Sequence, residues 1–279
     1  MASDFRLYHE NNCDSLLAFG GGSPMDACKA VAARITRPHK SVNELQGLLK
    51  VIKKTPPIFA VPTTAGTGSE TTIAAVITEA KTHHKASIND PHLIPSFAVL
   101  DPELTLSLPP QTTAETGLDA LCHAVEAYTN NTYNTRLEKE MAEKAVRLIH
   151  ENLYTAYCHG DNIEARQNMQ LAAFYAGRAF TRGCVGYVHA IGHTLGGLYG
   201  LPHGRAMGIL LPHVIAYNAG LEEAGETEAL FRYARIANML GISAGTPKAT
   251  VHGLIRQIRN RMKRIGIPEL ITELGIDRE

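Results

Sequence analysis

Three consecutive glycines separate a short apolar stretch of this chain from a helical pattern. The stretch 15–19 (SLLAF) has the length and composition of a buried strand, and it ends at the glycines 20–22. Ser23 and Pro24 then suit the start of a helix, with Ser23 as its N-cap and Pro24 at its first position. Strand, glycine turn and helix form the first part of a βαβ unit, so this region predicts a parallel sheet.

The strand-rich character continues as far as a double proline, Pro109 and Pro110. Three further segments have strand character: 57–61 (PIFAV), 75–78 and 97–100. After the prolines the segments are long and helical, with few β-branched runs. The sequence therefore predicts an α/β domain over residues 1–110 and an all-helical domain over residues 111–279.

The composition of this 279-residue chain excludes several classes of partner. Lys and Arg total 27 and Asp and Glu total 27, so the formal net charge is zero and we expect no nucleic-acid partner. No apolar run has the length of a membrane span, so we expect no membrane partner. The start MASDFRLYHE lacks the features of a signal peptide. The five cysteines form no CxxC pair, which is typical of reduced thiols, so we expect a cytoplasmic protein.

Two loops that follow predicted strands have the composition of a phosphate-binding site. The glycines 20–22 let a ligand approach the backbone closely, and the following helix offers unpaired N–H groups with a partial positive charge. The second loop, 63–70 (TTAGTGSE), supplies hydroxyl groups and two glycines. Each loop alone is equally consistent with a tight turn or a helix cap. Because both loops follow strand C-terminal ends, together they favour a crevice for a nucleotide.

A carboxylate and four histidines fall at metal-ligand spacings in the second half of the chain. Asp119 and His123 are four residues apart, as are His189 and His193, and His203 follows in the turn PHG. Residues four apart share one helical face, so each pair can direct two polar groups toward one point. Imidazoles with a carboxylate suit zinc or iron. The spacing alone leaves a catalytic metal site and ordinary packing histidines as alternatives.

Five segments together resemble the iron-containing alcohol dehydrogenase family, also called group III. They are GGGSPMDACKA, PTTAGTGSE, LDPEL, TGLDALCHAVEAY and GYVHAIGHTLGGLYGLPHG. The segments occur in the family's order and extend over nearly the whole chain, which is far more specific than one short pattern. The resemblance implies a dehydroquinate-synthase-like fold: an α/β nucleotide-binding domain followed by an all-α metal-binding domain, with the active site in the cleft between them.

The resemblance also implies roles for individual residues. The metal ligands that it implies are Asp119, His123, His189 and His203. His193 would lie beside the metal without binding it and act as the catalytic group in proton transfer. The cofactor-binding residues that it implies are Gly21, Gly22, Ser23, Thr63, Thr64, Thr67 and Lys85. The first three would hold the pyrophosphate, and Lys85 rests on the least distinctive surroundings.

The implied activity is hydride transfer between an alcohol and an aldehyde or ketone, with NAD or NADP as the cofactor. A metal ion, Fe²⁺ or Zn²⁺, would act as a Lewis acid on the substrate oxygen. The nicotinamide carries the hydride while the protein orients it. Histidine titrates near neutral pH, so His193 can relay the hydroxyl proton to solvent. The resemblance also leads us to expect a small alcohol or aldehyde substrate and a homo-oligomer.

The chain departs from the family at its ends. Family members usually carry additional strands ahead of the glycine turn and a further stretch of helix at the end, so we expect a chain truncated at the N-terminus and slightly at the C-terminus. The predicted parallel sheet would then be incomplete. One alternative is a catalytically weak or inactive metal-binding remnant that lacks a complete nucleotide site. Another is a sugar-phosphate cyclase, which shares the general architecture, although GHTLGGLYGLPHG suits the dehydrogenases better.

Overall fold

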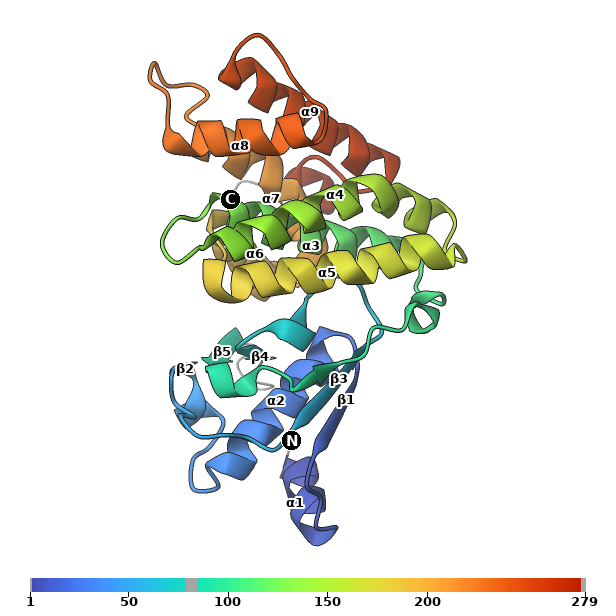
Figure 1. Ribbon diagram of the computed structural model, residues 1–279, viewed down its shortest axis with the longest axis vertical. Helices are drawn as coiled ribbons and strands as arrows, with labels where there is room; N and C mark the ends of the chain where they lie inside the picture. Colours follow the sequence, from blue (N-terminus) through green and yellow to red (C-terminus); the bar gives the residue numbers. More distant parts are fainter. Residues whose placement is uncertain (1, 79–84, 277–279) are drawn as a thin grey trace.

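The structure, a computed structural model, describes residues 2–78 and 85–276 (Figure 1). The strands are β1 (Leu16–Gly20), β2 (Gly47–Leu48), β3 (Ile58–Pro62), β4 (Ala74–Thr78), β5 (Lys85–Asn89) and β6 (Phe97–Ala98). The helices are α1 (Ala2–Glu10), α2 (Gly22–Thr36), α3 (Pro110–Thr129), α4 (Arg136–Cys158), α5 (Ile163–Gly183), α6 (Tyr187–Tyr199), α7 (His203–Asn218), α8 (Glu228–Met239) and α9 (Pro247–Arg264). Short 3-10 helices are η1 (Asn43–Leu45), η2 (Ser69–Thr71), η3 (Pro91–Leu93), η4 (Pro102–Thr105) and η5 (Ile271–Leu274). An α/β part followed by a helical part confirms the predicted fold class, whereas the division at residue 110 stays a prediction.

The strands β1, β3 and β6 form a parallel sheet in that spatial order, as the strand–turn–helix pattern predicts. Leu16 pairs with Ile58, and Phe59 pairs with Phe97. β6 is shorter than the predicted 97–100, although Val99 N still donates a hydrogen bond to the carbonyl oxygen of Ala60 at 2.9 Å.

A second small sheet has the order β2–β5–β4. The predicted strand at 75–78 is present as β4, but it pairs antiparallel with β5 and does not join the main sheet. β2 is parallel to β5 and only two residues long. Neither β2 nor β5 is evident from the sequence, because one is too short for a pattern and the other, KASIN, mixes polar and apolar residues.

The prediction that Ser23 caps the first helix of the βαβ unit is wrong. α2 begins at Gly22, its N-cap is Gly21, and no side chain caps it. The cause is close packing, since a Cβ on Gly21 would lie 3.2 Å from Thr64 Cγ2 and a Cβ on Gly22 would lie 2.8 Å from Thr67 Cγ2. The tight packing therefore favours glycine where serine would otherwise be the better cap.

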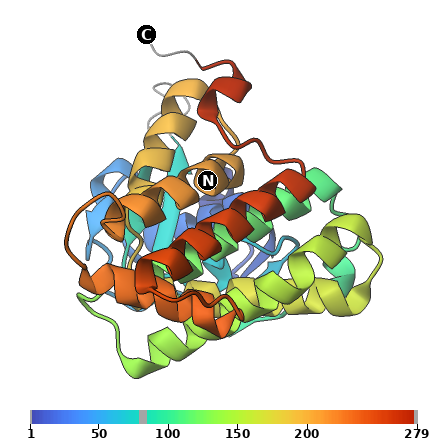
Figure 2. The same ribbon diagram turned by 90° about the horizontal axis from the view of Figure 1, so that it is seen from above.

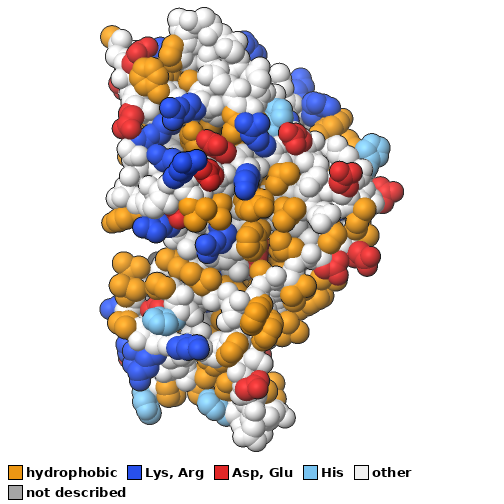
Figure 3. All heavy atoms as spheres, viewed as in Figure 1, with side chains coloured by type: hydrophobic (Ala, Val, Ile, Leu, Met, Phe, Trp, Pro, Cys, Tyr) orange, Lys and Arg blue, Asp and Glu red, His pale blue; other side chains and the backbone are white. Residues whose placement is uncertain are grey.

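The two faces of the main sheet differ in what covers them. Ala18, Ile58 and Ala60 point toward α2 and pack with Met25 and Ala32. The opposite face carries large side chains that are 50% to 68% exposed: Leu17, Phe19, Phe97 and Val99. Hydrophobic side chains gather over β1 and β3 on this side of the α/β part (Figure 3). Successive side chains of a strand point to opposite faces, which separates the buried residues from the exposed ones.

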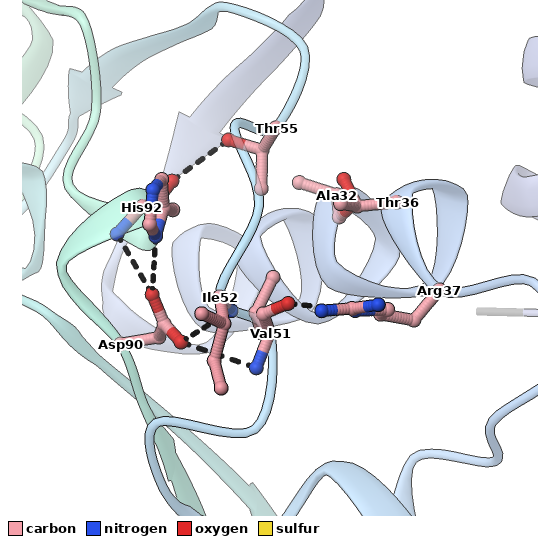
Figure 4. A network of polar contacts seen from close by, with 8 residues as sticks. All are labelled: Ala32, Thr36, Arg37, Val51, Ile52, Thr55, Asp90 and His92. Carbon is pink, nitrogen blue, oxygen red and sulfur yellow. Dashed lines mark hydrogen bonds and ion pairs between the residues drawn. The ribbon is translucent and has the colours of Figure 1, made fainter.

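A buried aspartate holds the connection between β2 and β3 (Figure 4). The carboxylate of Asp90 accepts hydrogen bonds from Val51 N at 3.1 Å, Ile52 N at 2.9 Å and His92 N at 3.1 Å. Burial alone would raise the pKa of Asp90, but these bonds hold it below its usual range. Arg37 Nε donates to the carbonyl oxygen of Val51 at 2.7 Å. The network maintains Ile52 at a φ of 48°, a left-handed conformation that is unfavourable for a β-branched residue.

A buried lysine and a half-buried aspartate tie α2 to the loop that precedes β4. Lys29 is fully buried, and its Nζ donates to the carbonyl oxygens of Thr72 and Ala74 and to Thr72 Oγ1, each at 2.9 Å. Asp26 accepts a hydrogen bond from Ser69 Oγ at 2.7 Å. Because α2 begins at the glycine turn, these bonds fix the turn relative to the threonine-rich loop.

The Glu70 side chain lies in the same buried region. Its shifted pKa leads us to expect that the free energy of unfolding depends on pH. Burial raises the pKa of Glu70 to about 7, against the opposing effects of its own backbone N–H and of Lys29. The stability associated with this group is fully present below its unfolded pKa, near 4.5, and is lost as the pH rises through about 7. We expect Glu70→Gln to raise the free energy of unfolding by about 2–3 kcal/mol at pH 8, and to have little effect at pH 4.

Urea denaturation of parent and variant at the two pH values measures this difference. Glu44→Gln is the matched control, because hydrogen bonds from Ser41 lower the pKa of exposed Glu44 and its removal should not stabilise the fold at pH 8. An equal effect of Glu70→Gln at both pH values would contradict the prediction.

The central helix of the second part is α3, which is buried without interruption from residue 117 to residue 128. α4, α5 and α7 pack around it. α8 and α9 lie on its outer side, and the view from above shows α9 along the top of this layer (Figure 2). Within residues 2–78 and 85–276, no helix combines the length and apolar character needed to cross a membrane. All five cysteines are free thiols.

Candidate metal and cofactor site

Three helices bring the predicted metal ligands together. Asp119 and His123 lie one turn apart on α3, His189 lies in the first turn of α6, and His203 is the first residue of α7. Asp119, His123 and His189 are 4%, 6% and 2% exposed, whereas the His203 side chain is 32% exposed. The cluster is therefore buried on the α3 side and accessible on the α7 side.

The carboxylate of Asp119 lies where the three imidazoles converge. Asp119 Oδ1 is 3.4 Å from His203 Nε2, 3.5 Å from His189 Nε2 and 3.9 Å from His123 Nε2. Asp119 Oδ1 and His189 Nε2 are buried without a hydrogen-bond partner among the described residues. Ligand atoms about 2.1 Å from a tetrahedral metal lie about 3.4 Å from one another. Asp119, His123 and His189 thus fit one divalent ion, with one ligand atom each within 4.8 Å of the others, and His203 approaches the same carboxylate oxygen.

The protonation states of the cluster also suit a metal. Burial lowers the pKa of His123 to about 3, against the opposing charge of Asp119. Burial would raise the pKa of Asp119, but the imidazoles of His123 and His203 hold it below its usual range. A neutral imidazole and an ionised carboxylate are the forms that bind metals. Burial would lower the pKa of His189, but Asp119 and Glu126 raise it to about 9, so a metal at its Nε2 displaces a proton.

Glu126, which was not predicted from the sequence, contacts the cluster through His189, on the ring edge that faces away from Asp119. It lies on α3, is 5% exposed, and pairs through Oε2 with His189 Nδ1. Its other oxygen accepts a hydrogen bond from Val188 N at 2.7 Å. Its spacing was an available signal, because positions 119, 123 and 126 share one helical face.

The proposed proton-transfer residue, His193, lies on the accessible side of the cluster. It is one turn beyond His189 on α6 and is exposed. Its ring stacks on His203, with the ring centroids 5.1 Å apart, and its centroid is 5.9 Å from that of His189. This position is next to the ligands and in contact with solvent.

The structure brings the two predicted cofactor loops into direct contact. Gly21 packs on Thr64 and Gly22 packs on Thr67, as the close approaches at the start of α2 demonstrate. Thr63 N donates a hydrogen bond to the carbonyl oxygen of Gly20 at 3.0 Å. The glycine turn and the threonine-rich loop therefore form one continuous surface at the C-terminal ends of β1 and β3.

The threonine-rich loop also packs directly on α3, which carries Asp119 and His123, and on α5. A Cβ on Gly66 would lie 2.6 Å from Thr116 Cβ, one turn ahead of Asp119 on α3. A Cβ on Gly68 would lie 2.7 Å from Gly177 Cα on α5. Gln170 Nε2 donates to the carbonyl oxygen of Pro62 at 3.2 Å, at the end of β3. The two predicted cofactor loops thus meet, at one tightly packed junction, the helices that surround the candidate ligands Asp119, His123, His189 and His203.

For two other predicted cofactor residues, Ser23 and Lys85, the structure gives their position in the chain fold but no contact with the second loop. Ser23 is exposed in the first turn of α2, beside the glycines with which it was grouped. Lys85 is the first residue of β5, and its side chain lies outside the described part of the chain. Its assignment stays a prediction.

The sequence matches two family descriptions along most of its length. Residues 4–102 match "Iron-containing alcohol dehydrogenase" and residues 113–279 match "Fe-containing alcohol dehydrogenase family, C-terminal". The NAD-dependent methanol dehydrogenase of Bacillus methanolicus is 38% identical over 275 residues, which are 98% of this chain and 70% of that protein. The 1,3-propanediol dehydrogenase of Klebsiella pneumoniae is 38% identical over 97% of this chain and 68% of its own length.

Solved structures of similar proteins share the fold closely. A 1,3-propanediol oxidoreductase superposes with a TM-score of 0.91 at 36% identity, over 99% of this chain and 70% of that one. The sulfoacetaldehyde reductase of Bifidobacterium kashiwanohense, solved with NAD⁺, has a TM-score of 0.86 at 32% identity, over 99% and 70% of the two chains. The described chain therefore spans about 70% of the length of these relatives.

Proposed function

Because the chain belongs to the iron-containing alcohol dehydrogenase family, we propose that it transfers a hydride between an alcohol and NAD or NADP. The observation that carries the proposal is the convergence of three imidazole Nε2 atoms on Asp119 Oδ1, across a packed junction from the two predicted cofactor loops. Relatives are named as NAD-dependent and as NADPH-dependent dehydrogenases, so both cofactors fit the proposal. The same names favour small alcohols and the corresponding aldehydes as substrates.

The metal, Fe²⁺ or Zn²⁺, would supply Lewis acidity at the substrate oxygen. We assign its binding to Asp119, His123, His189 and His203. Asp119 supplies the negative charge of the site, and the rings of His123 and His189 stack with their centroids 4.4 Å apart. His203 borders the accessible side, from which an alcohol would enter.

The cofactor would lie over the two loops. Gly21, Gly22 and Ser23 would receive the pyrophosphate at the N-terminus of α2, where backbone N–H groups carry partial positive charge. Thr63, Thr64 and Thr67 would orient the nicotinamide half toward the metal cluster. His193 would accept the hydroxyl proton of the alcohol and release it to solvent.

The remaining expectations stay part of the proposal. We propose a cytoplasmic protein on the unpaired pattern of its cysteines, a homo-oligomer on the family resemblance, and no nucleic-acid or membrane partner on the neutral net charge and the lack of a long apolar run. The inactive-remnant alternative differs from the enzyme in one measurable property, because a remnant binds metal but no dinucleotide.

A fluorescence titration with NADH tests the proposal. We expect the Fe²⁺-loaded protein to bind NADH and to reduce NAD⁺ when a primary alcohol is added. Gly22→Ala should weaken NADH binding about tenfold or more, because the new Cβ would lie 2.8 Å from Thr67 Cγ2 and separate the two loops.

Gly225→Ala is the matched control, because a Cβ on Gly225 meets nothing within 4 Å and binding should stay unchanged. Metal binding without any NADH binding by the parent protein would overturn the dehydrogenase proposal and favour the remnant. Equal NADH affinity in parent and Gly22→Ala would overturn the placement of the pyrophosphate.

A further inference from the structure

We infer that Glu126 is a positioning residue that prepares His189 for the metal and anchors helix α6 to helix α3. The inference rests on the proposed metal site, but it concerns a residue outside the proposed ligand set. Glu126 is 5% exposed, so its charge is paired inside the protein rather than with solvent. Both of its carboxylate oxygens accept hydrogen bonds from the first turn of α6.

The first role of Glu126 is to select the tautomer of His189. An imidazole that donates a hydrogen bond from Nδ1 carries its lone pair on Nε2 when the ring is neutral. Glu126 Oε2 accepts from Nδ1, and His189 Nε2 faces Asp119 Oδ1 at 3.5 Å. A carboxylate behind a ligating histidine fixes the orientation of the ring and raises its basicity. Glu126 thus directs the lone pair of His189 toward the ligand cluster.

The second role is to hold the beginning of α6. The N-cap of this helix, Gly186, offers no side-chain hydrogen bond. Glu126 Oε1 instead accepts from Val188 N at 2.7 Å, so a carboxylate from another helix satisfies one of the free N–H groups. A Cβ on Gly186 would lie 3.0 Å from Glu126 Oε1, so the close approach of the carboxylate favours glycine there. The helix that carries His189 is therefore fixed by the helix that carries Asp119.

The two roles require two acceptors, which makes glutamine an informative substitution. The Glu126→Gln side chain has the same shape but only one oxygen. If that oxygen accepts from Val188 N, the amide N–H₂ faces His189 Nδ1 and favours the tautomer that has its proton on Nε2. If the amide is reversed, the N–H₂ faces the N–H of Val188. The first arrangement opposes metal binding at His189, and the second keeps the tautomer but sets two donors against each other at the start of the helix that carries His189.

Titration with Co²⁺, followed by its visible absorption, measures the effect. We expect Glu126→Gln to weaken Co²⁺ binding about 10–100-fold, the usual cost of losing such a partner. At saturating Co²⁺ the variant should regain the absorption spectrum of the parent, because all four ligands remain. Glu126→Asp keeps both acceptor oxygens on a side chain that is one methylene shorter. Its Co²⁺ affinity should therefore lie between those of the parent and Glu126→Gln.

Glu138→Gln is the matched control. Glu138 is a buried carboxylate in the same helical part, where it accepts a hydrogen bond from Thr135 N at 2.8 Å and contacts no histidine of the cluster. This control should lower the thermal unfolding temperature and leave the Co²⁺ affinity unchanged.

The outcomes are distinct. Co²⁺ affinity in Glu126→Gln within about threefold of the parent would overturn the inference. If Glu126→Gln does not fold, Glu126→Asp decides, and parent-like affinity there would overturn it too. A parent protein that binds no Co²⁺ would instead overturn the proposed metal site.

Discussion

Replacing Asp119 with asparagine is expected to remove nearly all of the about one equivalent of divalent metal that we expect the parent protein to retain. The substitution keeps the shape of the side chain but removes the negative charge on which three imidazoles converge at 3.4 Å to 3.9 Å. We expect affinity to fall by well over 100-fold, more than the 10–100-fold typical for loss of a second-layer partner. His203→Ala should also lower occupancy, since it removes the most exposed of the proposed ligands.

Elemental analysis after purification without chelator measures the occupancy. Asp161→Asn provides the control, because Asp161 is exposed in the turn before α5 and its removal should leave the metal content unchanged. Parent-like metal content in Asp119→Asn would show that the histidines bind the ion without this carboxylate, and the ligand assignment would be wrong.

Replacing His193 with alanine is expected to separate activity from metal binding. His193 stacks on His203 from the solvent side, and the three buried candidate ligands lie within 4.8 Å of one another without it. The variant should therefore keep its metal and lose about 10²–10⁴-fold in turnover, the usual range for a general acid–base group. Parallel measurements of metal content and NAD⁺ reduction provide the two readouts.

His213→Ala is the control for this substitution, because His213 is exposed on α7 and has no proposed role. Loss of metal together with activity in His193→Ala would instead identify His193 as a ligand. Unchanged turnover would show that the proton leaves by another route.

Helical spacing is a local property, so the sequence alone could pair Asp119 with His123 and His189 with His193, whereas the full ligand set came from the family resemblance and stays a prediction. Asp119 and His123 are four apart, and the structure places both on the buried face of α3. The convergence of α3, α6 and α7 was not available from spacing, and it entered only through the resemblance to a known family. Glu126 was overlooked because its partner, His189, is 63 residues away in the sequence.

The fold was predictable where a strand has enough residues to display a pattern. β1, β3 and β4 were identified within one residue at each end, whereas the two-residue strand β2 has no pattern to detect. The start of α2 was misassigned because capping preferences describe a helix in isolation. Tertiary contact with Thr64 and Thr67 overrides the preference for serine in this protein.

The contact between Gly68 and Gly177 limits how this scaffold can acquire a new substrate range. Backbone meets backbone there, so any side chain added at either position would force the threonine-rich loop away from α5. The approach of the threonine-rich loop to α5 is consequently set by backbone atoms. The end of α6 is different, because Leu198 is 72% exposed and a Cβ on Gly197 meets nothing within 4 Å. Residues at the end of α6 can therefore be replaced without disturbing the junction.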